Sequence, residues 1–330
     1  MGQLQTLLHS AANHCRGLDC EKAIDALDRA VRQYPQSVEP YYRLGVCYSG
    51  CCRAHTLVSA GLAVAHLKHA IKRLEESGPS LALTQSVEAL ANTYMNHLDS
   101  SIERKAAIEC GQKAAVMYRD QGLLLEAARV EHNLGNTCCE LPEAKFPGKW
   151  RNAVFHFEKA LEARTKGDHP RLYAATMINL GTAYRELPDP GRAGNVRQAI
   201  GCYAQAHHVY GPAAYPLQNA NLHNNLGNAF LSLAAADMTK ASKNIRCALH
   251  HFELALRVRN KRERPCDYAV TQLNRGQAFL RWTMLEPLRF LDEAAMCFKE
   301  ASECFRLCGQ NDNAGVAEVY WAQTQSLPFI

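Results

Sequence analysis

Asparagine side chains recur at one fixed place along the second half of this chain. Asn133, Asn179, Asn225 and Asn274 each stand two residues before a glycine, at spacings of 46, 46 and 49 residues. A primary amide carries both a donor and an acceptor, so it matches the N–H and C=O groups of an extended peptide without requiring a particular peptide side chain. The chemistry that this pattern predicts is therefore recognition of a peptide backbone.

A second row of polar residues accompanies the first, one position after the same small residue of each repeat. The predicted contact residues are Asn92, Asn133, Asn136, Asn179, Asn225, Asn228 and Asn274, with Arg129, His132, Arg185 and Arg281 around them. The positive charge excess of this set predicts a bound segment that carries carboxylates. An alternative stays open: repeat duplication alone would copy such amides, which would then bond neighbouring helices.

Motifs for catalysis and metal binding do not occur in the sequence. It contains no GxSxG, GxxxxGK[ST], HExxH or GxGxxG pattern, so we expect no enzyme activity and no cofactor. Fourteen cysteines in a long chain without a secretory signal predict reduced thiols in a cytosol. We interpret Cys47, Cys51 and Cys52, and also Cys297, Cys304 and Cys308, as structural thiols, the last three packing against the C-terminal segment; a metal or redox cluster is the alternative.

The amides need helices to position them, and the stretch from Leu172 to Tyr210 shows how. It reads as two amphipathic helices joined by a Pro/Gly interruption. Small residues at Gly181, Ala199 and Ala206 allow two helix backbones to approach closely. Such a helical hairpin cannot bury both of its faces, so it requires similar neighbours.

Equivalent small residues mark those neighbours. In the first helices they fall at Gly45, Ala91, Gly135, Gly181, Gly227 and Gly276. In the second helices an alanine pair falls at 23/30, 63/70, 107/114, 153/160, 199/206, 248/255 and 294/301. Seven occurrences of one pattern predict a repeat array.

These residues resemble the tetratricopeptide repeats. In the first repeat Leu7, Ala11, His14, Ala23, Leu27, Ala30 and Pro35 fall on the positions of the 34-residue signature. In later repeats the small residue lies 18 rather than 12 positions before the first alanine of the pair, so the turn or the helices must be longer. The stretch NLGTAYRELPDPGRAGNVRQAIGCY is similar to the long repeats of bacterial signalling proteins that are linked to caspase-like CHAT proteases.

The resemblance implies an all-α fold, an α-α superhelix or TPR solenoid of about seven helical hairpins with a C-terminal capping helix. We expect one domain over 1–330, with repeats at about 4–37, 38–83, 84–127, 128–173, 174–219, 220–268 and 269–314, and a cap at 315–330. The cap should cover the last repeat with Val316, Val319, Tyr320 and Trp321.

The function that follows from the resemblance is a noncatalytic scaffold whose first helices line a concave groove and hold an extended peptide or a partner protein. The alternative is a regulatory or sensor subunit of a larger effector, with a CHAT protease or a ribonucleoprotein defence complex as partner.

Charge and hydropathy exclude other partners. A net charge of +5 is too mild to require nucleic acid, and the one basic run, Arg257, Arg259, Lys261, Arg262 and Arg264, is only a weak candidate because no aromatic residues are interleaved with it. No apolar run reaches the roughly 18 residues that span a bilayer, so we expect a soluble, cytoplasmic protein. Residues 1–6 fit the N-myristoylation pattern at Gly2, but an ordinary start to a helix is the stronger interpretation, because so short a pattern is common by chance.

Overall fold

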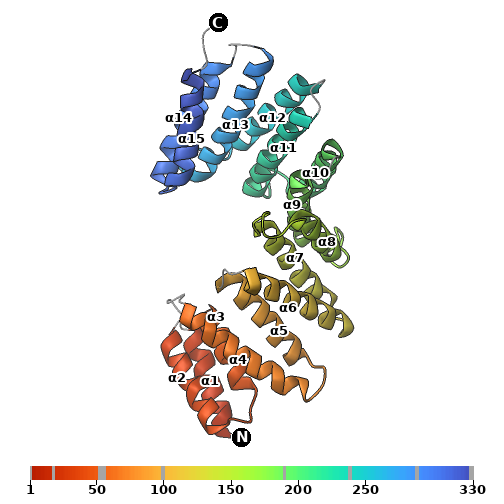
Figure 1. Ribbon diagram of the computed structural model, residues 1–330, viewed down its shortest axis with the longest axis vertical. Helices are drawn as coiled ribbons and strands as arrows, with labels where there is room; N and C mark the ends of the chain where they lie inside the picture. The colour runs from red at the N-terminus through yellow and green to blue at the C-terminus, as the bar shows by residue number, and fades with distance from the viewer. Residues whose placement is uncertain are drawn as a thin grey trace. The chain divides into compact units, whose positions relative to one another are not determined.

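Helices make up the regular structure of the described part of the chain. The computed structural model describes residues 2–16, 19–50, 57–97, 101–188, 191–236, 240–286 and 290–326, and no strand occurs among them (Figure 1). The chain forms two compact units, Met1–Ala163 and Arg164–Ile330. Each unit is a series of helical hairpins.

The first unit contains four hairpins. Their helices are α1 (Gly2–Arg16) and α2 (Cys20–Gln33), α3 (Glu39–Gly50) and α4 (Leu57–Glu75), α5 (Leu81–His97) and α6 (Ser101–Asp120), and α7 (Leu124–Glu140) and α8 (Lys149–Leu161). The side chain of Asp19 accepts a hydrogen bond from the backbone N–H of Lys22 and so caps α2. Gly122, at a φ of 73°, ends α6 in a left-handed turn.

The second unit contains three hairpins and a final helix. They are α9 (Pro170–Glu186) and α10 (Arg192–His207), α11 (Pro216–Ala236) and α12 (Ala241–Leu256), α13 (Pro265–Leu285) and α14 (Leu291–Leu307), and then α15 (Asn311–Ser326). Proline begins α9, α11 and α13. The first backbone N–H groups of a helix have no acceptor within the helix, so a residue without an N–H costs no hydrogen bond there. The predicted all-α fold with seven hairpins and a last helix is thus confirmed.

The repeated alanine pairs are the most deeply buried residues of the hairpins. All fourteen, from Ala23 and Ala30 to Ala294 and Ala301, have 0% of their surface exposed. A methyl group at these positions allows the neighbouring helix backbones to approach. Their burial confirms the interpretation of the pattern as the packing signature of the second helices.

The glycines of the first helices contact one large side chain each. A Cβ added to Gly135 would lie 2.5 Å from the ring of Phe157, one added to Gly181 would lie 2.7 Å from Tyr203, and one added to Gly276 would lie 2.7 Å from Phe298. These rings are 0% exposed. Any larger residue at these positions would therefore collide with the aromatic ring of the second helix in the same hairpin.

The longer spacing of the later repeats is accommodated in different ways. In the fourth hairpin α7 ends at Glu140 and α8 begins only at Lys149, so the extra residues form a turn. In the fifth, α10 begins at Arg192, seven residues before Ala199, so its first turn is extended. In the seventh it is α13 that is longer, with 21 residues against 17 in α9.

Two expectations about the C-terminal region are corrected. Cys308 does not simply pack against the last helix, because it forms a disulfide with Cys266, so reduced thiols do not describe all the cysteines. Helix α15 does cover the last hairpin, but through Ala314, Ala317 and Tyr320, whose ring stacks on Phe298 at 5.1 Å. Val316 and Val319 point outward instead, with 47% and 69% of their surface exposed.

Two further predictions concern the thiols of Cys51 and Cys52 and the absence of a membrane-spanning segment. Cys51 and Cys52 lie outside the described residues. Within them, no helix combines the length and the apolar character needed to cross a bilayer.

Candidate functional site

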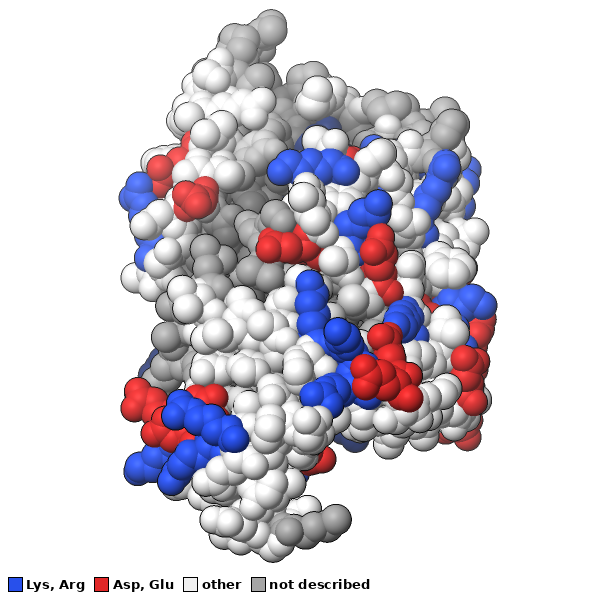
Figure 2. Space-filling view, turned by 60° about the horizontal axis from the view of Figure 1, so that its bottom comes forward, with Lys and Arg blue, Asp and Glu red and all other residues white. Residues whose placement is uncertain are grey.

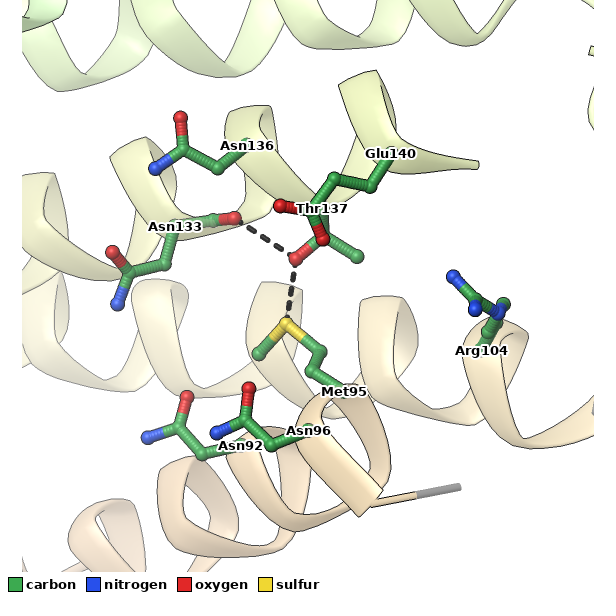
Figure 3. Close-up of a pocket in the computed structure, with 8 residues that line it drawn as sticks. All are labelled: Asn92, Met95, Asn96, Arg104, Asn133, Asn136, Thr137 and Glu140. Carbon is green, nitrogen blue, oxygen red and sulfur yellow. Dashed lines mark hydrogen bonds between the residues drawn. The ribbon is translucent and has the colours of Figure 1, made fainter. Parts of the chain in front are cut away.

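Four asparagines meet in a hollow between α5 and α7 of the first unit (Figure 3). Asn92 and Asn96 come from α5, and Asn133 and Asn136 come from α7. Met95, Arg104, Thr137 and Glu140 complete the lining of this α5–α7 hollow, whose volume is about 390 Å³. Thr137 Oγ1 on α7 donates to Met95 Sδ on α5 over 2.7 Å, so a hydrogen bond connects the two helices within this hollow. Three predicted contact residues, Asn92, Asn133 and Asn136, are thus brought together.

Arg129 and His132 occupy other positions on α7. Arg129 donates two hydrogen bonds to the carboxylate of Glu88 on α5, one of them from Nη2 over 2.9 Å, and Tyr118 donates to the same carboxylate over 2.8 Å. Burial alone would raise the pKa of Glu88, but these hydrogen bonds outweigh it and the pKa is lowered. Glu88 therefore neutralises Arg129. The ring of His132 packs 5.5 Å from that of Phe157.

A second hollow lies between α9 and α11 in the second unit. Its amides are Asn179 from α9 and Gln218, Asn221 and Asn225 from α11. Ala175, Ile178, Tyr210 and Arg259 complete the lining of this α9–α11 hollow, which encloses about 410 Å³. The structure therefore brings together Asn179 and Asn225, which are 46 residues apart in the sequence.

A third hollow lies between α11 and α13. Asn228, Asn274 and Gln277 line it, together with Arg185, Arg281, Leu231 and Ser232. Asn274 donates to Asn224 Oδ1 over 3.1 Å, and Arg281 donates to the backbone oxygen of Leu231 over 2.9 Å. Arg185 forms an ion pair with Glu186 at 2.7 Å. This α11–α13 hollow holds the last four predicted residues, and Asn274 also makes the interhelix bond that the alternative interpretation describes.

The three hollows share a chemistry. The α5–α7 and α9–α11 hollows each present four primary amides and the α11–α13 hollow presents three. Pockets for small molecules are mostly apolar with a few polar groups. Surfaces lined by amides instead suit a ligand that offers repeated donors and acceptors, as an extended peptide backbone does.

Comparison with known proteins identifies the fold. No family model matches the chain, and no curated protein matches its sequence. Among solved structures, the C-terminal part of a TPR repeat-containing protein from Cytophaga hutchinsonii superposes with a TM-score of 0.57 at 14% identity, over 94% of this chain and 98% of that one. The apo form of RapI gives 0.54 at 14% identity, over 95% of this chain and 98% of its own. This chain has the tetratricopeptide-repeat fold. The narrower likeness to CHAT-linked repeats stays a prediction.

A polar link between residues twelve positions apart recurs along the chain, and sequence reasoning missed it. In four of its five occurrences, a cation or histidine at or just after the end of a second helix bonds a polar residue in the next first helix or in α15; in the other, Arg164 and Thr176 both lie within the second unit. The pairs are Arg119–Glu131, Arg164–Thr176, His207–Asn219, Arg259–Thr271 and Arg306–Glu318. The fixed spacing is visible in the sequence and could have revealed the link.

Bonds within the array account for three residues of the basic run, and only that of Arg259 is a twelve-residue link. Arg259 is 7% exposed, and it donates to Thr271 Oγ1 and to Asn221 Oδ1, each over 2.7 Å. Lys261 pairs with Glu303 at 3.0 Å and Arg264 with Asp267 at 3.3 Å. Three of the five cations therefore stabilise the repeat itself. On the face that Figure 2 shows, positive and negative side chains lie interspersed.

Histidines of three successive helices meet in the second unit. His223 Nδ1 on α11 lies 3.0 Å from His251 Nδ1 on α12, and the ring of His207 on α10 is 5.4 Å from that of His223. Burial, and then the neighbouring histidines, lower the pKa of both His223 and His251 to about 4. Among the described residues, no group of three or more His, Cys, Asp or Glu side chains is arranged to hold a metal ion.

Two of the buried thiols, those of Cys138 and Cys297, are poor nucleophiles. Burial raises the pKa of Cys138 to about 12 and that of Cys297 to about 11. A thiol reacts as its thiolate, so both are almost entirely unreactive at neutral pH. Their location in the hairpin cores agrees with a structural role.

Proposed function

We propose that this protein is a noncatalytic interaction scaffold that binds an extended peptide segment of a partner protein through the amide-lined faces of its first helices. The observation that carries the proposal is the convergence of eleven amides on three hollows. A primary amide can donate to a peptide carbonyl and accept from a peptide N–H. Asn221 Oδ1 already accepts from Arg259 and Asn274 Nδ2 already donates to Asn224, so these two amides offer the peptide only their remaining hydrogen-bonding capacity. The partner's main chain then provides the recognition, and its side chains adjust the specificity.

Charge supports an acidic segment at the second unit. Among the described residues, Arg185 and Arg281 line the α11–α13 hollow without an acidic residue beside them, although Arg185 also pairs with Glu186 on its own helix. In the α9–α11 hollow, Arg259 is 7% exposed and its Nε has no hydrogen-bond acceptor among the described residues. A carboxylate of the bound segment would compensate these charges and orient the segment. The α5–α7 hollow has both Arg104 and Glu140, so we expect it to favour neither acidic nor basic peptide segments.

The test begins with selection of binders from a randomised peptide display library against the full chain. Changing Asn179→Ala together with Asn225→Ala removes two of the four amides of one hollow and should weaken the selected peptides by more than about tenfold. The affinity is measured by fluorescence anisotropy, and circular dichroism should show unchanged helicity and melting. Selected peptides should be enriched in Asp and Glu.

A matched variant controls for the loss of surface amides as such. Gln198 and Gln205 are exposed on α10, outside the three hollows. Gln198→Ala with Gln205→Ala should bind the peptides as the wild-type chain does. Equal affinity of the Asn179/Asn225 double variant and the wild type would rule out the proposal.

The regulatory alternative uses the same surface. A sensor subunit of a caspase-like protease or of a ribonucleoprotein complex would hold a segment of that effector in these hollows. Pull-down from the native host with the wild type and with the Asn179/Asn225 variant separates the two roles: an effector enzyme that is lost with the variant identifies a regulatory subunit.

A further inference from the structure

Cysteine pairs occur in the first and in the last helical hairpin regions of the chain. Cys266, at the start of α13, forms a disulfide with Cys308, at the end of α14. Cys15, in the last turn of α1, lies with its Sγ 3.2 Å from the Sγ of Cys47 in α3, and both are thiols. The two pairs join residues that are 42 and 32 positions apart.

The Cys15–Cys47 pair lies at the edge of the first core. Cys47 is 3% exposed and packs with Leu8, Ala11 and Leu44. Cys15 is half-buried beside them. One thiol of the pair can therefore be reached from solvent, while the other is held in place by the core.

We propose that Cys15 and Cys47 are a second redox-active pair, and that disulfide formation at both pairs clamps the two terminal hairpins of the array. Among the described residues, the α1–α2 hairpin packs on another hairpin at one side only, through α3, so it opens more easily than a hairpin that is packed on both sides. A bond from α1 to α3 ties the first helix to the next hairpin. The bond from Cys266 to Cys308 ties the start of α13 to the corner that leads into α15.

The step needs an oxidant of the low-molecular-weight disulfide class, such as glutathione disulfide. The half-buried thiol of Cys15 loses its proton to solvent, and its thiolate attacks one sulfur of the oxidant, which breaks that S–S bond and releases one glutathione thiolate. Cys47, after losing its proton, attacks Cys15 Sγ of the mixed disulfide and releases the second thiolate. Two cysteine thiols are oxidised, one small disulfide is reduced to two thiols, and the two sulfurs approach by about 1.2 Å to the bonded distance.

The consequence is a large change in local opening of α1. Closing a loop of this length lowers the entropy of the opened chain, which by the chain-entropy relation corresponds to a factor of roughly a hundred or more in the opening equilibrium. Amide hydrogens of α1 should then exchange about a hundredfold more slowly in the oxidised protein. Helices away from both pairs, such as α7, should be unaffected.

The experiment compares the full chain after equilibration in reduced glutathione and in glutathione disulfide. Peptide mapping by mass spectrometry without reduction should show a cross-link between the Cys15 and Cys47 peptides in the oxidised sample. Hydrogen exchange of the same samples should show the slowing in α1. Cys15→Ser should abolish both effects, and Cys247→Ser, which changes a half-buried thiol away from both pairs, should retain them.

Three results would overturn the inference. One is the absence of a Cys15–Cys47 cross-link at the oxidising extreme. Another is a cross-link of Cys15 to Cys20 or to any other cysteine in its place. The third is a correct cross-link with unchanged exchange in α1, which would show that the bond forms without acting as a clamp.

Discussion

Single glycines decide how closely the two helices of a hairpin approach. At Gly181 an added Cβ would lie 2.7 Å from Tyr203 Cε1 and 3.1 Å from the backbone oxygen of Ala199, and Tyr203 is fully buried. The residue was predictable from the sequence because its small size recurs with the spacing of the helices. Its contact was predictable for the same reason, since the ring stands at a constant offset in the second helix.

Replacing Gly181→Ala should therefore lower the free energy of unfolding by about 1 to 3 kcal/mol, because overpacking outweighs the gain in helix propensity. Urea unfolding followed by circular dichroism measures the change. Gly201→Ala is the matched control, because Gly201 has no atom within 4 Å of an added Cβ. That change should stabilise the protein by about 0.5 to 1 kcal/mol. A Gly181→Ala protein as stable as the wild type would contradict the close packing.

The partners of the polar residues were harder to predict. Sequence spacing placed Asn179 and Asn225 on one surface, but it did not show that Asn274 bonds Asn224 or that Glu88 neutralises Arg129. Such bonds depend on the distance between neighbouring first helices and on side-chain rotamers, which leave no periodic trace. Arg259 belongs to a basic run in the sequence, which suggests an exposed side chain. In the structure it is buried, and it donates to Thr271 and Asn221, which lie 12 and 38 positions away.

At the scale of helices, the twelve-residue link of Arg259 bonds the turn after α12 to α13. Arg259→Met keeps the apolar stem of the side chain but removes its bonds to Thr271 and Asn221. We expect a loss of about 2 kcal/mol in the free energy of unfolding. Arg262→Met removes an exposed arginine from the same run and should change the stability by less than about 0.5 kcal/mol. Equal effects of the two changes in urea unfolding would refute the link.

The packing of α11 on α12 should make the protein sensitive to acid. His223 and His251 have pKa values of about 4 in the folded protein against an ordinary 6.5, so the folded state favours their neutral forms. This contribution to stability is complete above pH 6.5 and is lost as the pH falls from 6.5 toward 4. Urea unfolding between pH 6.5 and 4 should show a smaller loss in the free energy of unfolding for His223→Gln than for the wild type.

The exposed His208 provides the control for that experiment. His208→Gln should show the acid sensitivity of the wild type. If the free energy of unfolding changed with pH in the same way for the wild type and for His223→Gln, the folded state would not favour the neutral form of the histidine pair.

Helix lengths were not predictable in the way that helix identities were. The spacing of 18 residues from Gly135 to Ala153, from Gly181 to Ala199 and from Gly276 to Ala294 is the same, yet it is filled by a turn, by an extended α10 and by an extended α13. A constant spacing reports where two packed residues lie and not how the chain connects them. In α15, Val316 and Val319 were expected inside because they are apolar, but the small Ala314 and Ala317 fit the contact.

At the scale of the molecule, the repeat array could be recognised from the sequence and its division into two units could not. The spacing from Gly135 to Gly181 equals that from Gly181 to Gly227, although the first interval contains the boundary at Ala163 and the second does not. The repeat pattern records the contacts within hairpins, which are similar throughout. All three amide-lined hollows lie within one unit or the other.

The central claim is that these hollows recognise the main chain of a peptide. The most direct measurement replaces single backbone amides of a selected peptide by esters, which removes an N–H donor while keeping the side chain. We predict that esters at the positions facing the amides weaken binding by about tenfold or more, whereas single alanine substitutions in the peptide change it far less. Esters that bind as well as the parent peptide, with affinity lost on alanine substitution instead, would contradict the account.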